Sequence, residues 1–171
     1  MLNSTRRGIQ LKLYVISDTH GKIQKALNVY SRLHSIDLIL HLGDIRGDAQ
    51  KIAESTGKTV ICVAGNNDEP RPKDDFHVLE TEYGNILLVH GHKQNVKHSF
   101  VNLLYRTCEL NCKAVLFGHT HIPVFTESNG IYLLNPGSLT FPFDGTLGSY
   151  AIVNTAKGEF SASIVYYQDV F

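Results

Sequence analysis

The sequence has little that would suit it to a membrane or to a long nucleic acid. None of its apolar runs approaches the roughly 18 residues that suggest a membrane-spanning helix. Its 16 basic and 16 acidic side chains cancel, so the formal net charge is zero, whereas non-specific binding to nucleic acid needs a basic excess. We therefore expect no membrane partner and no strong nucleic-acid footprint. A small phosphorylated ligand stays open, because a metal can supply positive charge locally.

Cysteine is scarce, with only Cys62, Cys108 and Cys112 present. Such a small, odd number suggests a reducing compartment, and no apolar signal-peptide core follows Arg6 and Arg7. We therefore expect a cytoplasmic protein. Cys108 and Cys112 stand four apart on an expected helix, where packing is the simpler interpretation, since zinc sites normally need four ligands.

Repeats, linkers and low-complexity segments are also absent from the sequence. The length of 171 residues suffices for one domain with a sizeable core. The hydrophobic share of 43% and the charged share of 19% are ordinary for a globular domain. We expect residues 1–10 to form a flexible N-terminal tail and residues 11–171 to form a single domain.

Short apolar runs alternate with segments of helical periodicity over the first two thirds of the chain. Apolar residues recur at helical spacing around Ile23–Leu33, Ala49–Glu54 and Val96–Leu110. Strands that alternate with helices predict a layered α/β domain. The runs are rich in Val, Ile and Leu and short enough to be buried strands. They are Leu11–Ile16, Leu38–Leu42, Thr59–Ala64, Ile86–Val89 and Ala114–Phe117.

The pattern changes in the last third of the chain. His121–Thr126 and Ile131–Leu134 flank a segment that contains Asn129-Gly130, and Asn-Gly is a strong hairpin signal. Two more strand-like runs follow at Tyr150–Asn154 and Ser161–Tyr167. We therefore expect this part of the chain to be antiparallel.

Each of the five expected early strands ends in a polar cluster. In open α/β sheets, ligands bind outside the carboxyl ends of the strands, so parallel strands would bring these clusters together. A single Asp or His after a strand is usually a helix cap or a satisfied polar group. No packing need, however, places such residues after every early strand. The clusters are Ser17–Gly21, Gly43–Asp44, Gly65–Asp68, His90–His92 and Gly118–His121.

The side chains in these clusters are carboxylates, amides and imidazoles. Such groups suit Mn²⁺, Zn²⁺, Fe or Ni rather than soft metals. Asp18 and His20 lie two apart, as do His119 and His121. In extended backbone, residues two apart point the same way. We therefore expect each pair to reach one centre.

The clusters form an ordered set of motifs. Asp-x-His, Gly-Asp, Gly-Asn-x-Asp, His-Gly-His and Gly-His-Thr-His follow one another along the chain. This order resembles the motif set of the calcineurin-like metallophosphoesterases, over about Leu11 to Ser138. The small size and Asn135-Pro136-Gly137-Ser138 are similar to the compact phosphodiesterases of the YfcE type. The resemblance implies a four-layer α/β/β/α sandwich with two packed mixed β-sheets.

The resemblance also implies a binuclear centre of two divalent ions. Mn²⁺ is the expected metal, with Zn²⁺, Ni²⁺ or Fe as alternatives. The implied activity is hydrolysis of a small phosphodiester by a metal-activated hydroxide. The implied ligands are Asp18, His20 and His121 for the first metal, Asn66, His90 and His119 for the second, and Asp44 as the bridge.

Three further residues are candidates for a catalytic role, namely Asn67, Asp68 and His92. Many family members carry His where this sequence has Asn67, and an amide cannot act as a general acid. We expect Asp68 to orient a ligand and His92 to touch the substrate. His41, in an apolar strand, is more simply a satisfied core histidine, with a ligand-orienting role as the alternative. Phe141-Pro142-Phe143 is more simply a packing loop, with a wall of the site as the alternative.

Two alternatives to a phosphodiesterase remain. The same fold serves as a protein-binding scaffold in the retromer subunit Vps29, where motif positions have been replaced. All seven implied ligands are present here, which favours an enzyme. The other alternative is a phosphomonoesterase. The sequence has no obvious arginine cluster for a dianionic monoester, which favours a diester. A homo-oligomer is left open.

Overall fold

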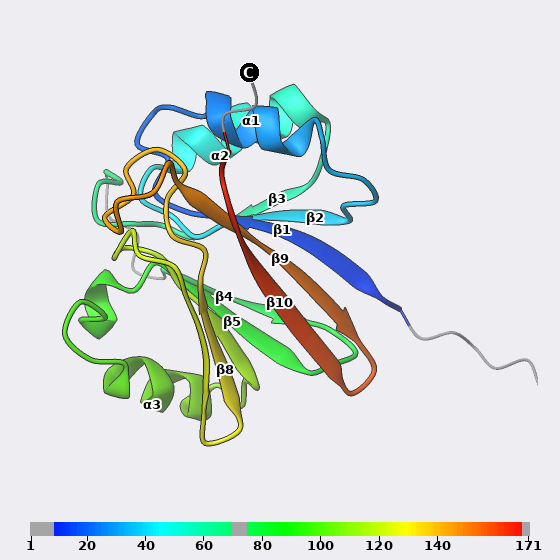
Figure 1. Cartoon of the computed structure of the whole chain (residues 1–171). Helices are drawn as coiled ribbons and strands as arrows, with labels where there is room; N and C mark the ends of the chain where they lie inside the picture. The colour runs from blue at the N-terminus through cyan, green and yellow to red at the C-terminus, as the bar shows by residue number, and fades with distance from the viewer. Residues whose placement is uncertain (1–8, 70–74, 169–171) are drawn as a thin grey trace, which may run out of the picture.

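The computed structural model describes residues 9–69 and 75–168 of the chain. They form two five-stranded sheets that pack face to face, with helices on the outer sides (Figure 1). The family resemblance predicted this α/β/β/α sandwich, and the prediction is confirmed. The expected N-terminal tail lies almost wholly outside the described residues. Among the described helices, none has the length and apolar character to cross a membrane.

The first sheet has the strand order β10-β9-β1-β2-β3. Strand β1 pairs in parallel with β2, and β2 pairs in parallel with β3, while β9 runs antiparallel to both β1 and β10. The carboxyl ends of β1, β2 and β3 therefore lie at one edge. The bounds are Leu11–Ile16 for β1, Leu38–His41 for β2, Val60–Cys62 for β3, Ser149–Ala156 for β9 and Glu159–Tyr166 for β10.

The second sheet has the strand order β4-β5-β6-β8-β7. Strands β5, β6 and β8 are parallel, and the edge strands β4 and β7 are antiparallel to their neighbours. Strand β4 was not expected, because only Leu79 is buried in it and no apolar run marks it. The bounds are Phe76–Glu80 for β4, Asn85–Val89 for β5, Ala114–Leu116 for β6, Val124–Ser128 for β7 and Ile131–Asn135 for β8.

The hairpin predicted at Asn129-Gly130 joins β7 to β8. Both turn residues have positive φ, 52° for Asn129 and 75° for Gly130, as a two-residue turn between twisted strands requires. The expectation of an antiparallel last third is confirmed for this hairpin and for β9 with β10. It is wrong for the pairing of β8 with β6, which is parallel, because the chain passes from β6 to the edge strand β7 and then returns to place β8 between them.

The helices cover the outer faces of the two sheets (Figure 1). Helices α1 (Gln24–Tyr30) and α2 (Arg46–Thr56) lie on the first sheet, and α3 (Val101–Glu109) lies on the second. A short 3-10 helix, η1 (His92–Gln94), follows β5. The helical periodicity of the sequence is therefore confirmed at all three expected places.

Helix α3 is shorter than the expected segment Val96–Leu110. Asn95 has a φ of 56°, a left-handed conformation that an α-helix does not accommodate, so the chain turns before α3 begins. Asn111, with a φ of 52°, comes just after the other end. Cys108 and Cys112 therefore do not share a helix, contrary to expectation. Cys108 is exposed, Cys112 is buried, and both are free thiols.

The main core lies between the two sheets. Leu13 and Val15 of β1 pack there with Leu88 of β5, while Tyr14 and Ile16 of β1 face the layer of α1 and α2. Central strands such as β1 are thus buried on both sides. This is why they read as unbroken apolar runs rather than as an alternation.

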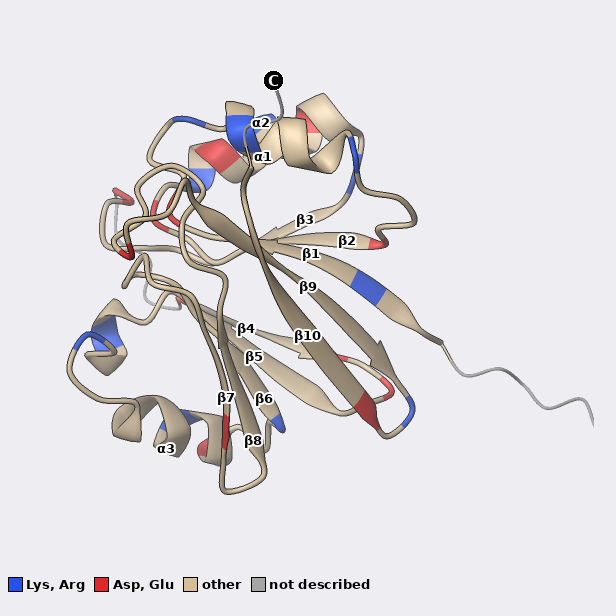
Figure 2. Ribbon diagram, in the orientation of Figure 1, with Lys and Arg blue, Asp and Glu red and all other residues tan. Residues whose placement is uncertain are grey.

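Most charged residues lie outside the two sheets, and Asp18, Asp44 and Asp48 are buried exceptions. In Figure 2, Lys, Arg, Asp and Glu lie mostly on helices, loops and strand ends, and the strands themselves are almost free of them. Burying a charge is unfavourable unless it is paired and hydrogen-bonded. A carboxylate that is buried in this fold therefore requires specific partners.

Leu88→Ala tests the role of the inter-sheet core. The variant should lower the free energy of unfolding by about 2–5 kcal/mol, because Leu88 is fully buried and its truncation leaves a cavity. Tyr105→Ala, at an exposed position of α3, should change it by no more than about 0.5 kcal/mol. Urea denaturation of both variants measures the difference. Equal losses would contradict a dominant inter-sheet core.

Candidate metal centre

The five predicted polar clusters meet at one end of the sandwich. Strands β1, β2 and β3 of the first sheet and β5 and β6 of the second all end there, and the loops that follow them gather at the left of Figure 1. The clusters therefore converge as predicted, but from two packed sheets rather than from the edge of one.

The backbone at this end is unusual. Positive φ is uncommon for residues other than glycine, and such strained conformations cluster at functional sites. The expectation that Asp18 and His20 sit in extended backbone is therefore wrong, although their side chains do converge. The predicted ligands with positive φ are Asp18 (55°), His20 (47°), Asp44 (95°), His119 (69°) and His121 (59°).

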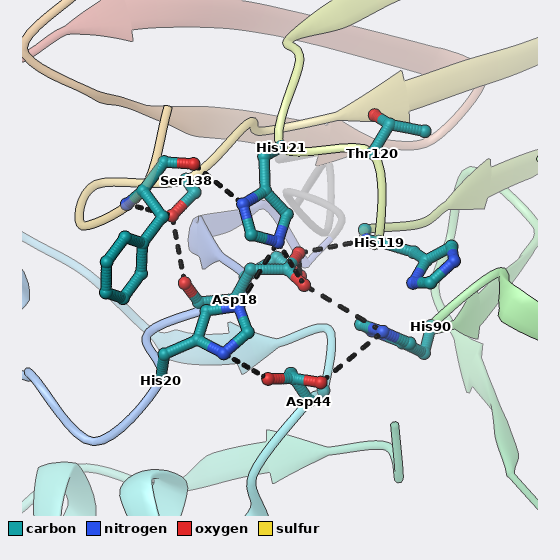
Figure 3. Close-up of polar contacts among 12 residues, drawn as sticks. Asp18, His20, Asp44, His90, His119, Thr120, His121 and Ser138 are labelled. Atoms are coloured by element: carbon teal, nitrogen blue, oxygen red, sulfur yellow. Dashed lines mark hydrogen bonds and ion pairs between the residues drawn. The ribbon is translucent and has the colours of Figure 1, made fainter. Parts of the chain in front are cut away.

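Asp18, His20 and His121 form a first group of potential ligands. One ligand atom from each lies within 4.8 Å of the others. The Nε2 atom of His121 is 3.3 Å from Asp18 Oδ1 and 3.2 Å from His20 Nε2. The other ring nitrogen of His20 lies 2.7 Å from Asp44 Oδ2. Figure 3 shows these side chains pointing toward one another, with Asp18 and His20 on one loop and Asp44 and His121 on two others.

Asp18, Asp44 and His90 form a second group by the same 4.8 Å measure. The Nε2 atom of His90 is 3.8 Å from Asp18 Oδ1 and 3.9 Å from Asp44 Oδ1. It is also 3.0 Å from Asn66 Oδ1. The two groups share Asp18, and Asp44 contacts both His20 and His90, so the groups adjoin.

His119 lies at the side of the second group. Its ring centroid is 5.0 Å from that of His90 (Figure 3), and among the described residues it belongs to neither group. His119 and His121 therefore do not meet at one centre, contrary to the expectation from their spacing. The backbone turns between them, where the amide of Thr120 donates to the carbonyl of Gly118.

The orientation of two rings bears directly on whether a cation fits. His90 Nδ1 lies 2.8 Å from the carbonyl oxygen of Leu42, and His121 Nδ1 lies 2.7 Å from that of Phe141. A carbonyl only accepts, so each Nδ1 carries a proton and the Nε2 of the neutral ring presents a lone pair. These Nε2 atoms face carboxylate and amide oxygens, which also present lone pairs. Divalent cations between them would satisfy all of these atoms.

Protonation equilibria at the centre favour the metal-binding forms of two residues. Burial raises the pKa of Asp18, but hydrogen bonding to His121 and the nearby His90 outweigh it and lower this pKa to about 2. Burial, with His90 beside it, lowers the pKa of His119 to about 4. At neutral pH Asp18 is therefore a carboxylate and His119 a neutral imidazole, the forms that bind metals.

His121 behaves differently, because burial lowers its pKa but its hydrogen bond to Asp18 outweighs this effect. The net result is a raised pKa. A proton therefore competes with a metal for its Nε2 atom, and metal binding there would release that proton.

Neighbouring groups fix the Asp18 carboxylate from several sides. Its Oδ2 atom accepts hydrogen bonds from Ser17 Oγ at 2.6 Å and from the backbone amide of His119 at 2.9 Å. The backbone carbonyl oxygen of Asp18 accepts another hydrogen bond, from Ser138 Oγ at 2.9 Å. Gly118 passes so close that a Cβ there would overlap Ser17 Oγ, so only glycine fits this approach.

The three candidate catalytic residues are placed in different ways. The amide nitrogen of Asn67 donates to both oxygens of Asp44, at 2.8 and 2.9 Å. Asp68 accepts from the backbone amides of Arg46, at 2.7 Å, and Gly65, at 2.9 Å, so it caps α2 and secures its own loop. The ring of His92 lies beside His90, with centroids 5.4 Å apart. Their catalytic roles stay predictions.

A buried relay of hydrogen bonds lies behind the centre, and the sequence did not suggest it. Gly43 N donates to His41 Nδ1 at 3.2 Å, so His41 Nε2 carries the proton and donates to Thr19 Oγ1 at 2.9 Å. Thr19 Oγ1 donates to Asp48 Oδ2 at 2.6 Å, and Gly21 N donates to the same oxygen at 2.7 Å. The relay ties the loop of Asp18 and His20 to the loop of Asp44 and to α2.

His41 is thus a satisfied core histidine that also supports the site. Burial lowers its pKa to about 4, so it stays neutral and keeps the tautomer that the relay needs. The signal for Asp48 was its place among Ala49 and Ile52, the buried residues of α2. A carboxylate on the inward face of an amphipathic helix calls for a partner.

Two aromatic rings stand beside the centre. Phe141 meets His20 edge-on with centroids 5.2 Å apart, and Phe143 stacks on His121 with centroids 4.5 Å apart. Both phenylalanines are exposed. This loop therefore forms a wall of the site, which was the alternative interpretation of the sequence, and not merely a packing loop.

The fold and the groups of potential metal ligands define a metal-binding α/β/β/α protein, and comparison with known proteins agrees with this class. Residues 11–158 match the family model described as the calcineurin-like phosphoesterase superfamily domain. The chain belongs to this family of metallophosphoesterases. Buried and half-buried His and Asp groups that could hold metal ions lie at one end of its two sheets.

Two relatives illustrate the match in sequence. A probable metallophosphoesterase of Mycoplasma genitalium, MG207, is 32% identical over 163 residues, which cover 92% of this chain and 96% of the relative. The phosphodiesterase YfcE of Escherichia coli is 26% identical over 162 residues, covering 84% and 88%. The similarity therefore extends along most of each protein.

Solved structures agree with the fold. A predicted phosphoesterase from Streptococcus pneumoniae is similar with a TM-score of 0.77 and 27% identity, covering 92% of this chain and 90% of the other. Vps29 from Entamoeba histolytica, complexed with Zn²⁺, is similar with a TM-score of 0.69 and 22% identity, covering 91% and 99%. At that identity the likeness to Vps29 concerns the fold alone.

Asp48→Ala tests the relay. The variant leaves Thr19 and the amide of Gly21 without their acceptor, so the loop of Asp18 and His20 should lose its fixed position. Mn²⁺ affinity should fall by about 10–100-fold, as is typical when groups that orient ligands are removed. Isothermal titration calorimetry measures the affinity.

Asp48→Asn serves as the matched control, because its amide oxygen still accepts both hydrogen bonds. It should retain most of the affinity. Native affinity in Asp48→Ala, with the fold intact by circular dichroism, would show that the relay does not position the ligands.

Proposed function

We propose that this chain is a phosphodiesterase that holds two divalent cations, with Mn²⁺ as the expected ion, and hydrolyses a small phosphodiester. The observation that carries the proposal is the convergence of lone-pair donors on two adjoining groups that share Asp18. The proposed ligands are Asp18, His20 and His121 for one cation, Asn66, His90 and His119 for the other, and Asp44 between them.

When bound, the cations would supply a water of lowered pKa and stabilisation of charge on the phosphoryl oxygens. In the overall reaction a water oxygen bonds to phosphorus, the bond to one ester oxygen breaks, and the alcohol leaves with a proton. The protein residues hold the reacting groups in place. Carbonyl oxygens fix the rings of His90 and His121, and Asn67 holds both oxygens of Asp44.

Charge supports a phosphate ester as the substrate. The carboxylates of Asp18 and Asp44 offset only part of the charge of two divalent cations. The loaded centre would therefore keep a positive charge and attract a phosphate anion.

The distribution of arginines supports a diester over a dianionic monoester. Bidentate Arg contacts are common where a protein recognises phosphate. The structure describes three arginines, of which Arg32 follows α1, Arg46 begins α2 and Arg106 lies in α3. They are divided between the two helical layers, so they do not gather at the centre. The relative YfcE is itself named a phosphodiesterase.

A metal-binding scaffold like Vps29 is the alternative from a different functional class. A scaffold with no catalytic task has no need of a complete set of ligands or of strained backbone to aim them. The positive φ values at five of these residues therefore favour the enzyme. Elemental analysis together with turnover of bis(p-nitrophenyl) phosphate separates the two functions.

Asp44→Ala tests the binuclear centre. Asp44 lies between His20 and His90, so its loss should abolish binding of both cations. Turnover of bis(p-nitrophenyl) phosphate should fall by more than about 100-fold, because groups that only orient ligands are already worth 10–100-fold. Glu80→Ala, at an exposed position of β4, is the control and should match the native protein. Near-normal turnover in Asp44→Ala would exclude a two-cation centre bridged by this residue.

Asn67 leads to a prediction about the leaving group. An amide cannot donate a catalytic proton, and general acid assistance is typically worth about 10²–10⁴-fold. The native protein should therefore show a steep fall of kcat/KM as the pKa of the leaving alcohol rises. Asn67→His should flatten this dependence, helping alkyl leaving groups more than nitrophenolate. A series of aryl and alkyl diesters, assayed at saturating Mn²⁺, measures both slopes. Coincident slopes in a variant that binds both cations would show that position 67 has no part in departure.

A further inference from the structure

An apolar pocket opens beside the candidate metal centre. Its volume is about 390 Å³, and its apolar walls are Val96, Phe100, Ile122, Val124 and Phe143. Ligand pockets in proteins span roughly 300–1,000 Å³. The pocket is therefore of the size that a small organic group would occupy, and it is far larger than a methyl group needs.

The pocket shares a wall with the first group of ligands. The ring of Phe143 stacks on His121 with centroids 4.5 Å apart, and its backbone amide donates to the carbonyl of His121 at 3.3 Å. Thr120, which also lines the pocket, stands between His119 and His121 in the chain (Figure 3). A phosphate at the centre would thus have this pocket as its neighbour.

Two large apolar side chains of the pocket are open to solvent. Ile122 is 43% exposed and Phe143 is 63% exposed. Neighbouring exposed apolar side chains beside a polar site mark a surface that something covers during function. When loaded with cations, the adjacent centre would attract a phosphate, which makes the organic part of a phosphate ester the occupant best matched to this place.

The polar groups of the pocket narrow the chemistry of that occupant. Lys97 is its single charged lining residue. Lys97 lines the pocket together with Thr120, the residue between the proposed ligands His119 and His121, so its charge lies on the side of the pocket that adjoins the metal centre. Thr120 Oγ1 is already engaged by Asn135 Nδ2 at 3.0 Å and by the backbone of Ile122 at 3.2 Å. The pocket therefore offers apolar surface and one cation, which suits an anion that carries an apolar group.

We propose that this pocket receives an aryl-sized apolar ester group of the substrate, while the phosphate lies at the metal centre with Lys97 adding positive charge beside it. The inference rests on the proposed function and adds the class of substrate to it. Diesters with an aryl-sized group should be preferred over dimethyl-sized ones. A single methylene in a hydrophobic pocket is worth roughly 10–200-fold in selectivity.

Binding of two simple monoanions tests this assignment. Methyl phenyl phosphate and dimethyl phosphate carry the same charge and differ only in one ester group. Neither has an activated leaving group, so their affinities are measurable by calorimetry on the Mn²⁺-loaded protein. The native protein should bind the phenyl ester at least about 10-fold more tightly.

Ile122→Glu should bring the two affinities close to equality, because it places a carboxylate in the pocket. Phe125→Glu is the matched control, since Phe125 is 40% exposed and does not line the pocket. It should keep the native preference. Lys97→Gln should weaken both esters by a similar factor and leave their ratio unchanged, because it acts on the phosphate charge.

The outcomes separate this inference from the proposed function. Two outcomes would overturn the pocket assignment, namely equal affinities of the native protein for the two esters, or a phenyl preference that Ile122→Glu leaves intact. If the native protein still turns over bis(p-nitrophenyl) phosphate, the proposed phosphodiesterase activity is unaffected by either outcome. If Ile122→Glu alone removes the phenyl preference but the native protein shows no turnover of bis(p-nitrophenyl) phosphate, the proposed phosphodiesterase activity is wrong and the pocket assignment stands. If Ile122→Glu dissociates an oligomer in sedimentation velocity and leaves the ester preference unchanged, the pocket is a contact between copies of the chain and the assignment is wrong.

Discussion

Asp18 stands at the end of β1 in one sheet, and its carboxylate accepts a hydrogen bond from the backbone amide of His119, which follows β6 in the other. The same carboxylate faces His121 and His90 and takes part in both groups of potential ligands. It is almost completely buried, so no solvent relieves its charge. The geometry of the whole centre depends on this one side chain being held between two sheets.

The rest of the fold can be understood as support for that arrangement. Leucines and valines on facing strands set the distance between the sheets. The relay through His41, Thr19 and Asp48 sets the position of the loops that β1 and β2 deliver. The backbone strain at Asp18 and Asp44 persists because packing and hydrogen bonds around it leave no alternative. Rigid strands and the strained loops at their ends together orient the ligand atoms.

The parts of this centre that the sequence predicted are those that local pattern encodes. Apolar runs mark buried strands, and residues such as Asp18 and His90 come soon after them. Parallel pairing accounts for the convergence within each sheet, but Asp18 and His90 meet only because the two sheets pack together. The parts that it did not predict depend on contacts distant in the chain. Thr19 meets Asp48 only because α2 packs beside the first loop, and β4 is a strand only because β5 offers it an edge. The turn that starts at Asn95 runs into the first residues of the segment Val96–Leu110, whose periodicity alone predicts a helix throughout, and so α3 begins only at Val101.

The hydrogen bond from His121 to the loop containing Phe141 and Phe143 has an evolutionary consequence. The acceptor is the backbone carbonyl of Phe141, which every amino acid possesses, so the side chains of this loop are not needed to orient the ring. Substitutions in the loop can reshape the wall beside the centre while the histidine keeps its direction. Because the backbone of the loop orients the histidine and its side chains form the wall, one ancestral centre can give rise to many substrate preferences by changes at a few exposed positions.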